Sequence, residues 1–272
     1  MPFELRGGIN TPQERLLENI ATNIRRPLPQ VQPHEPNDQR IAMVGGGPSL
    51  VDTLGELRDQ IYAGVKVIAV NGSHDWLIER GIRPSAFVML DARPSNARFV
   101  KRWVAGCKYF IASQCDPGVF DALTGAEVYI FHCDLGTPKL SAILDRHYFG
   151  RYYEVAGGST VMLRGMLLMR MLGFRYIDLY GFDGCILDGK DHAYPQPENA
   201  TDAIVRVTAR LPGNEREFRC APWMAKQVEE FQDIVKVCGD MFQLNVHGDG
   251  LIAWLVRTGA TIQMERDGNG KD

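Results

Sequence analysis

The sequence predicts an α/β fold with a doubly wound, mostly parallel, Rossmann-like sheet, and two observations lead to this prediction. From Ile41 onward, short runs rich in β-branched and aromatic residues alternate with runs whose apolar residues recur at helical spacing. The first apolar run, Ile41 to Val44, passes directly into three glycines and then an amphipathic segment, which is the order strand, tight turn, helix. Such alternation is typical of parallel strands joined by right-handed crossovers.

Residues 1–39 are expected to form an appendage to this core. Four aliphatic residues fall at helical spacing after the start signal Thr11-Pro12, namely Leu16, Leu17, Ile20 and Ile24. A short amphipathic helix is therefore predicted, and its apolar face is expected to contact another subunit, which would make the protein a homo-oligomer. Four prolines between Arg25 and Gln39 predict a semi-extended linker, because proline fixes φ and removes a backbone donor.

The core domain is predicted over residues 40–258. Its strands are expected at residues 41–44, 65–70, 86–90, 109–112, 128–131 and 176–180, and its helices at residues 52–62, 73–79, 95–104, 118–123 and 159–172. The alternation then stops, because residues 181–201 are polar and rich in Gly, Asp and Pro. A loop of this length is expected to be a lid-like insertion or a binding loop.

A small hairpin is predicted next, from residues 203–211 and 217–220 around the turn 212–214. Pro222 opens a helix with an apolar stripe, followed by a strand at residues 243–246, a glycine-rich turn at 247–250 and a helix at 251–256. The stripe indicates packing against the core rather than function. Residues 259–272 are expected to be a C-terminal tail.

Composition excludes several classes of function. A formal net charge of −3 and a pI near 6.1 give no bulk signature for binding nucleic acid or a membrane surface. Six cysteines without a C-x-x-C pair argue against a structural zinc site and against a disulfide framework. The sequence shows neither a signal peptide nor an apolar stretch of about 18 to 20 residues, so we expect a cytoplasmic protein without a membrane span.

The glycine-rich turn is the first candidate binding site. Its residues are Gly45, Gly46, Gly47, Pro48 and Ser49. Glycines allow close approach to an anion, and free N–H groups at the start of the following helix are expected to face it. The segment is neither the six-residue dinucleotide fingerprint nor a Walker loop, so a purely structural turn stays an equally good interpretation.

Polar residues after other strands extend this candidate site. Asn71 and Gly72 follow the second strand, and Gly158, Ser159 and Thr160 open the long helix after Val155 as a second helix N-terminus suited to an anion. A simple helix cap explains either motif as well.

Two carboxylates and a histidine are the candidate catalytic residues. Asp91 and Asp183 each follow an apolar strand, where a carboxylate is costly unless it caps a helix, binds a ribose hydroxyl or holds a metal. Together they are predicted to hold one Mg²⁺, which prefers oxygen ligands. His192 lies in the lid-like loop near Asp191 and is a candidate acid/base or a ligand for a leaving phosphate. A solvated loop histidine is the alternative.

The order of these motifs resembles a known family. The succession G-G-G-P-S-L, V-I-A-V-N-G, G-I-R-P-S-A-F-V-M-L-D, G-G-S-T-V, G-F-D with a later G-K-D-H-A, and N-V-H-G-D-G-L-I-A is similar to the 6-hydroxymethylpterin diphosphokinase MptE-like family (DUF115) over about residues 40–258. That family includes domains of flagellin-modifying motility accessory factors, and its fold resembles sialyltransferases of glycosyltransferase family 42.

The resemblance implies a nucleotide at the Gly45–Ser49 turn and Asn71, with Asp91, Asp183 and His192 at the family's acidic and histidine positions. For diphosphokinase members it implies Mg²⁺-assisted transfer of diphosphate from ATP to a hydroxymethyl-type small-molecule acceptor. Two departures exist. The final glycine-rich motif matches loosely, and Phe218–Cys220 stands where a sialyltransferase-like mechanism expects a histidine base.

Three hypotheses therefore stand after the sequence alone. The first is a diphosphokinase-like transferase that uses ATP. The second is a glycosyltransferase that uses a nucleotide sugar and closes residues 181–201 over it. The third is a nucleotide-binding module without catalysis, whose N-terminal helix docks into a larger assembly. A resemblance of this kind fixes the fold and the ligand class better than the reaction.

Overall fold

The computed structural model of the chain describes residues 11–196 and 203–266. The predicted lid-like insertion is therefore described as far as Gln196, and its last expected residues, 197–201, lie outside the described part. The predicted C-terminal tail is described as far as Arg266.

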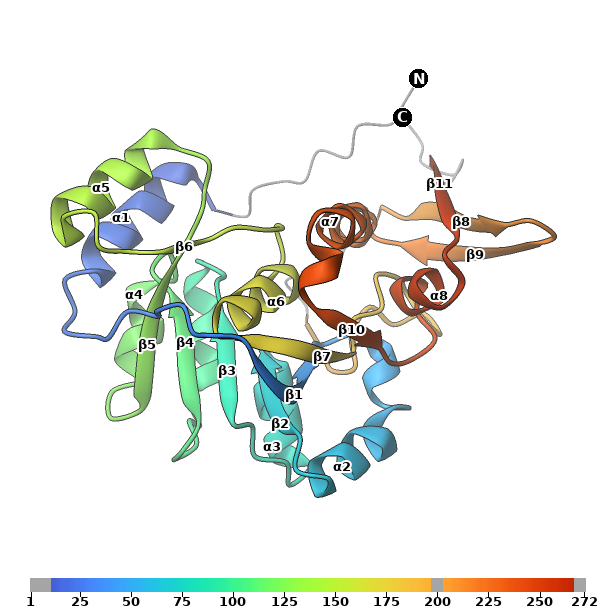
Figure 1. Ribbon diagram of the computed structural model, residues 1–272, viewed down its shortest axis with the longest axis horizontal. Coiled ribbons are helices and arrows are strands. Elements are labelled where there is room, and N and C mark those ends of the chain that lie inside the picture. Colours follow the sequence, from blue (N-terminus) through green and yellow to red (C-terminus); the bar gives the residue numbers. More distant parts are fainter. Residues whose placement is uncertain (1–10, 197–202, 267–272) are drawn as a thin grey trace.

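The core is one eight-stranded sheet in the order β10-β7-β1-β2-β3-β4-β5-β6, and all its neighbouring strands are parallel (Figure 1). The strands are β1 (Asn37–Val44), β2 (Lys66–Val70), β3 (Ala86–Met89), β4 (Lys108–Ala112), β5 (Glu127–Cys133), β6 (Glu154–Val155), β7 (Phe174–Tyr180) and β10 (Gln243–Val246). The predicted parallel α/β sheet is confirmed. The two-residue strand β6 was not predicted, because two residues carry no periodic signal.

The chain changes direction across the sheet between β1 and β7. Strands β1 to β6 follow one another in one direction, whereas β7 returns to pair with the other edge of β1, with Ile41 opposite Ile177. In open α/β sheets ligands bind outside the carboxyl ends of the strands at such a switch point. The glycine-rich turn after β1 and Asp183 after β7 therefore lie where a ligand is expected.

Helices cover both faces of the sheet. In Figure 1, α3 (Ser73–Glu79) and α4 (Pro117–Ala122) lie behind it, and α6 (Val161–Met171) lies in front, where it packs against β2 and β3. Helix α6 is apolar on most sides and comes close to the sheet because Gly165 has no side chain. A Cβ there would lie 2.9 Å from the Cε atom of Met43. Helix α2 (Leu54–Tyr62) connects β1 to β2.

Two elements differ from the prediction between β3 and β6. The helix expected at residues 95–104 is instead the 3₁₀ helix η2 (Pro94–Val100). Helix α5 (Pro138–Tyr148) was missed, because only Leu140 and Leu144 of its eleven residues are buried and the apolar stripe is too sparse to read.

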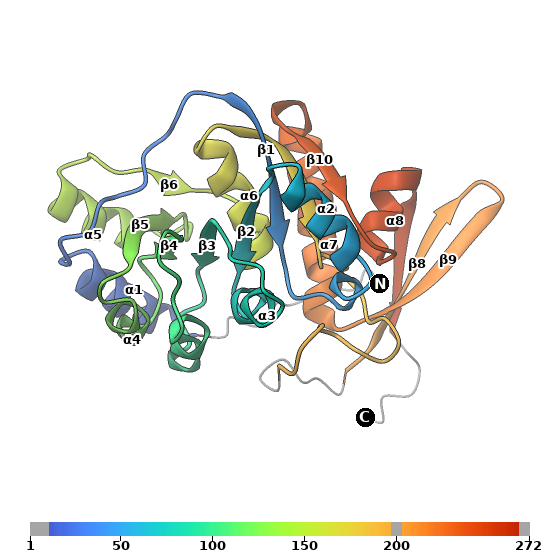
Figure 2. The ribbon, with the colours of Figure 1, turned by 90° about the horizontal axis from the view of Figure 1, so that it is seen from below.

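The C-terminal part carries a second, antiparallel sheet in the order β11-β8-β9, which extends to the right of the core in Figure 2. Strands β8 (Val205–Leu211) and β9 (Asn214–Cys220) are the predicted hairpin. Helices α7 (Pro222–Cys238) and α8 (Leu251–Thr258) pack beside it, with the 3₁₀ helix η4 (Gly239–Met241) after α7. Part of the expected tail is instead strand β11 (Thr261–Arg266), which pairs with β8.

The N-terminal helix α1 (Gln13–Asn23) packs on its own chain rather than leaving its inner face for another subunit. The Nδ2 atom of Asn19 donates to the carbonyl of Gln114 at 3.0 Å, and that of Asn23 donates to the carbonyls of Ser113 and Cys115 at 3.0 and 2.7 Å. The proline-rich linker then runs beside β5 and reaches β1, with the N–H of Val31 donating to the carbonyl of Ile130. Helix α1 is thus an integral part of the domain.

The six cysteines are free thiols, and all except Cys238 are buried. Burial raises the pKa of several of these thiols, for example that of Cys107 to about 12. Among the described residues no helix combines the length and the apolar character that crossing a bilayer requires.

Candidate functional site

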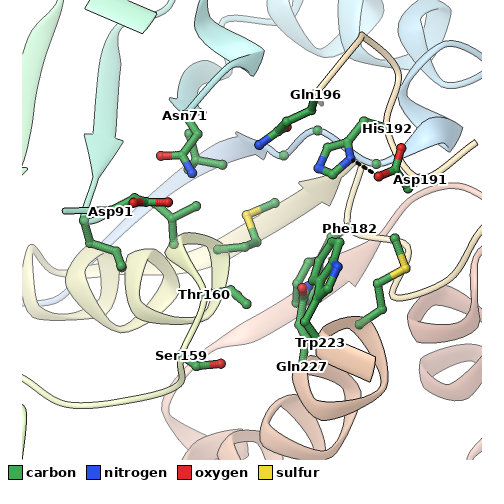
Figure 3. Close-up of a pocket in the computed structure, with 18 of the residues that line it drawn as sticks. Asn71, Asp91, Ser159, Thr160, Phe182, Asp191, His192, Gln196, Trp223 and Gln227 are labelled. Carbon is green, nitrogen blue, oxygen red and sulfur yellow. Dashed lines mark ion pairs between the residues drawn. The ribbon is translucent and has the colours of Figure 1, made fainter. Parts of the chain in front are cut away.

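A cavity of about 610 Å³ lies at the carboxyl ends of β7, β1, β2, β3 and β4. Its volume falls in the range of small-molecule sites. Residues after each of these strands contribute to its wall, together with the start of α6, the lid-like loop and one side of α7 (Figure 3). The labelled residues of the wall are Asn71, Asp91, Ser159, Thr160, Phe182, Asp191, His192, Gln196, Trp223 and Gln227.

The glycine-rich turn forms one end of the cavity, but three of its amides already donate to other parts of the chain. The N–H groups of Gly45 and Gly47 donate to the carbonyls of Tyr180 and Gly181 at 2.8 Å, and the N–H of Ser49 donates to Asp183 at 3.0 Å. The prediction that free N–H groups at this helix start face an anion is therefore wrong at these three positions. The glycines are required because the turn presses against the chain after β7, where a Cβ on Gly45 would lie 2.5 Å from the carbonyl oxygen of Gly181.

The lid-like loop lies directly over this turn. The N–H of Ala193 donates to the carbonyl of Gly46 at 2.8 Å, and a Cβ on Gly46 would overlap the hydroxyl of Tyr194. The same tyrosine ring covers Gly72, where a Cβ would lie 2.6 Å from it. Gly46 and Gly72 thus leave room for Tyr194 of the lid-like loop, which is a different reason for glycine from the predicted contact with phosphate.

Asn71 lies in the cavity wall in a strained backbone conformation. Its φ is +48°, in the left-handed region that asparagine tolerates better than most residues. The side chain does not cap α3, and its buried Oδ1 has no hydrogen-bond partner within the described structure. The helix-cap interpretation of Asn71 is therefore wrong, and its amide is available to a ligand.

His192 and Asp191 form a pair at the edge of the cavity. The Nδ1 atom of His192 lies 3.2 Å from Oδ2 of Asp191, and the imidazole is 10% exposed. Burial lowers the pKa of His192, and the neighbouring carboxylate of Asp191 only partly offsets this effect. The ring is therefore neutral near pH 7. Figure 3 shows its other nitrogen facing the cavity, where it can accept a proton.

The ring of His192 also rests on Trp223, the second residue of α7. The two ring centroids are 5.9 Å apart and the planes are inclined by 28°. The histidine ring therefore packs against the start of α7.

Asp183 is buried between the glycine-rich turn and the turn before α8. Its Oδ2 accepts the N–H of Ser49, and a Cβ on Gly250 would lie 2.6 Å from Oδ1. Burial outweighs the hydrogen bonds from Ser49 and raises the pKa of Asp183 to about 6. The final glycine-rich motif is thus explained by packing, because Gly248 and Gly250 let their turn approach Ser49 and Asp183.

Asp91 is held by Arg93. Its carboxylate accepts the backbone N–H of Arg93 at 2.9 Å and also the Nε and Nη2 groups of the same guanidinium. Asp91 and Asp183 each line the cavity but have different partners, and Oδ1 of Asp183 has no hydrogen-bond partner within the described residues, so the shared magnesium site stays a prediction. In the described part of the chain, no three His, Cys, Asp or Glu side chains are grouped as metal ligands.

The second predicted anion site is occupied by the chain itself. The backbone N–H and the hydroxyl of Ser159 donate to Oε2 of Glu230 at 2.8 and 2.7 Å, so a carboxylate from α7 sits at the start of α6. The neighbouring Thr160 hydroxyl is buried and has no hydrogen-bond partner among the described residues.

The structure brings most of the predicted site residues together. The predicted residues that line the cavity are Gly45, Gly46, Gly47, Asn71, Asp91, Ser159, Thr160, Asp183 and His192. Pro48, Ser49, Gly72 and Gly158 lie beside it without lining it. Gln114, Gln227 and Glu230 also line the cavity and were not predicted. Gln114 follows the end of β4, where the sequence places candidate ligand residues. On α7, Trp223, Gln227 and Glu230 share one face, because they are spaced by four and three residues. The position after a strand and the helical spacing were therefore both visible in the sequence.

An all-parallel sheet with a cavity at its switch point and a histidine–carboxylate pair in the wall defines a Rossmann-like protein with a cavity of the size of a small-molecule site. More specifically, the chain belongs to the 6-hydroxymethylpterin diphosphokinase MptE-like family, whose model matches residues 14–189. The match includes nearly all of α1, which was expected to lie outside the resemblance, and ends before the hairpin and α7. No curated protein matches the chain in sequence.

Two solved structures are similar to the chain, and the first of them shares its fold. The MAf glycosyltransferase from Magnetospirillum magneticum AMB-1 is 18% identical with a TM-score of 0.67, and the match covers 90% of this chain and 38% of that one. A mammalian sialyltransferase in complex with Gal-beta-1-3GalNAc-ortho-nitrophenol is 12% identical with a TM-score of 0.41, covering 90% and 92% of the two chains. This chain thus spans well under half of the MAf protein. The family thus follows from the match of its sequence model, and the MAf structure adds the fold alone.

Proposed function

We propose that this protein is a transferase acting on a nucleotide-activated donor, and that it is an MptE-like diphosphokinase, which transfers diphosphate from ATP to a hydroxymethyl-type acceptor. The observation that carries the proposal is the neutral His192, which lies 3.2 Å from Asp191 and faces the cavity at the switch point of the sheet. Membership of the family supports the choice of reaction.

In this reaction the acceptor hydroxyl gives its proton to the free nitrogen of His192. The acceptor oxygen forms a bond to the β-phosphorus of ATP, the bond between that phosphorus and the oxygen bridging to the α-phosphorus breaks, and AMP leaves. Asp191 stabilises the imidazolium that forms, because a nearby carboxylate favours the charged ring. Positioning by the closed lid supplies much of the remaining rate enhancement.

Glycosyl transfer from a nucleotide sugar is the second candidate. One observation favours it, namely that His192 rests on Trp223 at the start of α7. The sequence lacks a histidine just before this helix, where a sialyltransferase-like mechanism expects its base, but the lid brings one there. The fold shared with the MAf glycosyltransferase agrees with this alternative.

Product analysis distinguishes the candidates. The protein is incubated with ATP and a hydroxymethylpterin, and separately with UDP- and CMP-sugars, each with and without Mg²⁺. We expect AMP and a diphosphorylated product from the first mixture, and a loss of about 10²- to 10⁴-fold in turnover for His192→Gln, since a general base contributes that much.

The melting temperature and the nucleotide affinity of His192→Gln are the controls and are expected to change little. If the protein cleaves a nucleotide sugar but not ATP, its function is glycosyl transfer and the diphosphokinase proposal is wrong. Tight nucleotide binding without any product would support a binding module instead.

A further inference from the structure

The cavity extends well beyond the reacting end formed by His192 and the glycine-rich turn. Its wall continues along the strand ends from β1 past β2 and β3 to Gln114 after β4. Three strand spacings separate β1 from β4, which is about 14 Å at the usual distance between neighbouring strands. A ligand that fills both ends must therefore be elongated.

Gln114 presents a fixed hydrogen-bond acceptor at this far end. The residue is 8% exposed, and its Nε2 donates to the carbonyl of Leu90 at 2.9 Å. This bond settles which end of the amide is the oxygen. The Oε1 atom is buried and has no partner within the described structure. An N–H group of a ligand would satisfy it.

The surroundings of Gln114 suit a flat, largely apolar group. Leu90 and Leu16 line the same part of the cavity, Leu16 coming from α1, which the Asn19 side chain ties to the carbonyl of Gln114. Asp91 and Asn71 lie between this end and His192 in the order of the strands, and both offer oxygen acceptors suited to ribose hydroxyls. The far end therefore has the features of a subsite for a nucleobase.

We propose that Gln114, with Leu16 and Leu90, binds the nucleobase of the donor, and that its Oε1 accepts a hydrogen bond from an exocyclic amino group of that base. This inference rests on the proposed nucleotide-dependent transfer. With ATP as donor the group is the 6-amino group of adenine, and with a cytidine nucleotide it is the 4-amino group of cytosine. The N-terminal helix is then part of the binding site and contributes to the choice of donor.

Calorimetric titration of the full chain tests the subsite. The ligands are ATP, purine riboside triphosphate, which lacks only the 6-amino group, and inorganic triphosphate, which lacks the nucleoside. CMP and its analogue without the 4-amino group form a second pair. We expect the unchanged protein to bind the amino-bearing member of one pair about tenfold more tightly, the amount that one hydrogen bond typically contributes.

The variant Gln114→Met keeps the length of the side chain and removes the amide. We expect it to lose the tenfold preference by weakening the amino-bearing nucleotide alone, with inorganic triphosphate unaffected. Gln60→Met is the matched control, because Gln60 also has a buried, unpartnered Oε1 but lies in α2 and does not line the cavity. It should leave all affinities unchanged.

The outcomes separate the two proposals. If a nucleotide binds but neither pair shows a preference in the unchanged protein, or if Gln114→Met weakens both members of a pair equally, the base subsite is wrong and the proposed transfer stands. If no nucleotide binds the unchanged protein, both proposals are wrong. The comparison of analogues on the unchanged protein decides the question even where the variant folds poorly.

Discussion

His192 owes its protonation state to two opposing neighbours. Burial lowers its pKa, and the Asp191 carboxylate, 3.2 Å from Nδ1, raises it. The neutral form is therefore lost only when the pH falls below the usual value of 6.5 for a histidine. At the residue scale, the chemistry of the site depends on this balance.

Asp191→Asn tests this balance. Removing the carboxylate takes away the influence that raises the pKa of His192, so the acid limb of the pH profile of kcat should move to lower pH. Turnover at pH 7.5 should fall by about tenfold to a hundredfold, because the imidazolium loses its counter-ion. Asp188→Asn, which neutralises an exposed carboxylate in the same loop, is the control. An acid limb that stays in place or moves upward would contradict the pairing.

At the scale of elements, Glu230 connects α7 to the start of α6. Its carboxylate receives two hydrogen bonds from Ser159 and complements the positive end of the α6 dipole. It therefore occupies the position at which the sequence predicted a ligand anion. The same contact holds the two helices that form one side of the cavity.

Glu230→Gln should have two effects of opposite sign. The amide oxygen still accepts from Ser159 but carries no charge, so the free energy of unfolding should fall by about 0.3 to 1 kcal/mol. Binding of ATP should become a few-fold tighter, because a negative charge is removed from the cavity wall. Thermal denaturation and calorimetry measure the two. The neighbouring Glu229→Gln is the control, and weaker ATP binding by Glu230→Gln would show that the carboxylate itself helps to bind the ligand.

At the scale of the whole molecule, one buried carboxylate joins the elements on the side of the sheet where β10 lies. Asp178 of β7 is fully buried and accepts hydrogen bonds from Arg40 of β1, Asn245 of β10 and His247. Burial alone would raise the pKa of Asp178, but these donors outweigh it and hold the pKa at about 2. The ring of His247 stacks on Tyr180 at 4.1 Å and also contacts Glu56 of α2.

The protonated His247 should stabilise the fold in a defined pH window. Burial lowers its pKa, but the Asp178 and Glu56 carboxylates outweigh this effect, so the pKa of the folded state is raised above 6.5. The contribution is complete below pH 6.5 and is lost as the pH rises through the folded value.

His247→Phe keeps the stacked ring and removes both contacts. We expect it to lower the free energy of unfolding by about 1 to 2 kcal/mol at pH 6 and by clearly less at pH 9, with the Glu56 contact contributing little because that side chain is 62% exposed. Urea denaturation at both pH values measures the difference. The exposed His34→Phe is the control, and an effect of equal size at both pH values would contradict a charged His247.

The sequence by itself determined the order of strands and helices, since apolar periodicity is a local property. It placed seven of the eight strands of the parallel sheet within a few residues. Because ligands of open α/β sheets bind at the carboxyl ends of the strands, it also identified Asn71, Asp91 and Asp183 as residues that line the cavity. It also indicated the family through the order of short motifs. Helix α5 and strand β11 were not predicted, because the apolar residues of both segments are few. In addition, β8, the strand that pairs with β11, lies far away in the chain.

Only the tertiary structure decided what each site residue does. Whether the amides of Gly45, Gly47 and Ser49 are free depends on how close the chain after β7 comes, and it comes close enough to use them all. Whether Ser159 receives a ligand anion depends on Glu230, 71 residues away. Contacts across such separations leave no periodic signal in the sequence, so the roles of Asp183, Glu230 and Gln114 follow from packing alone.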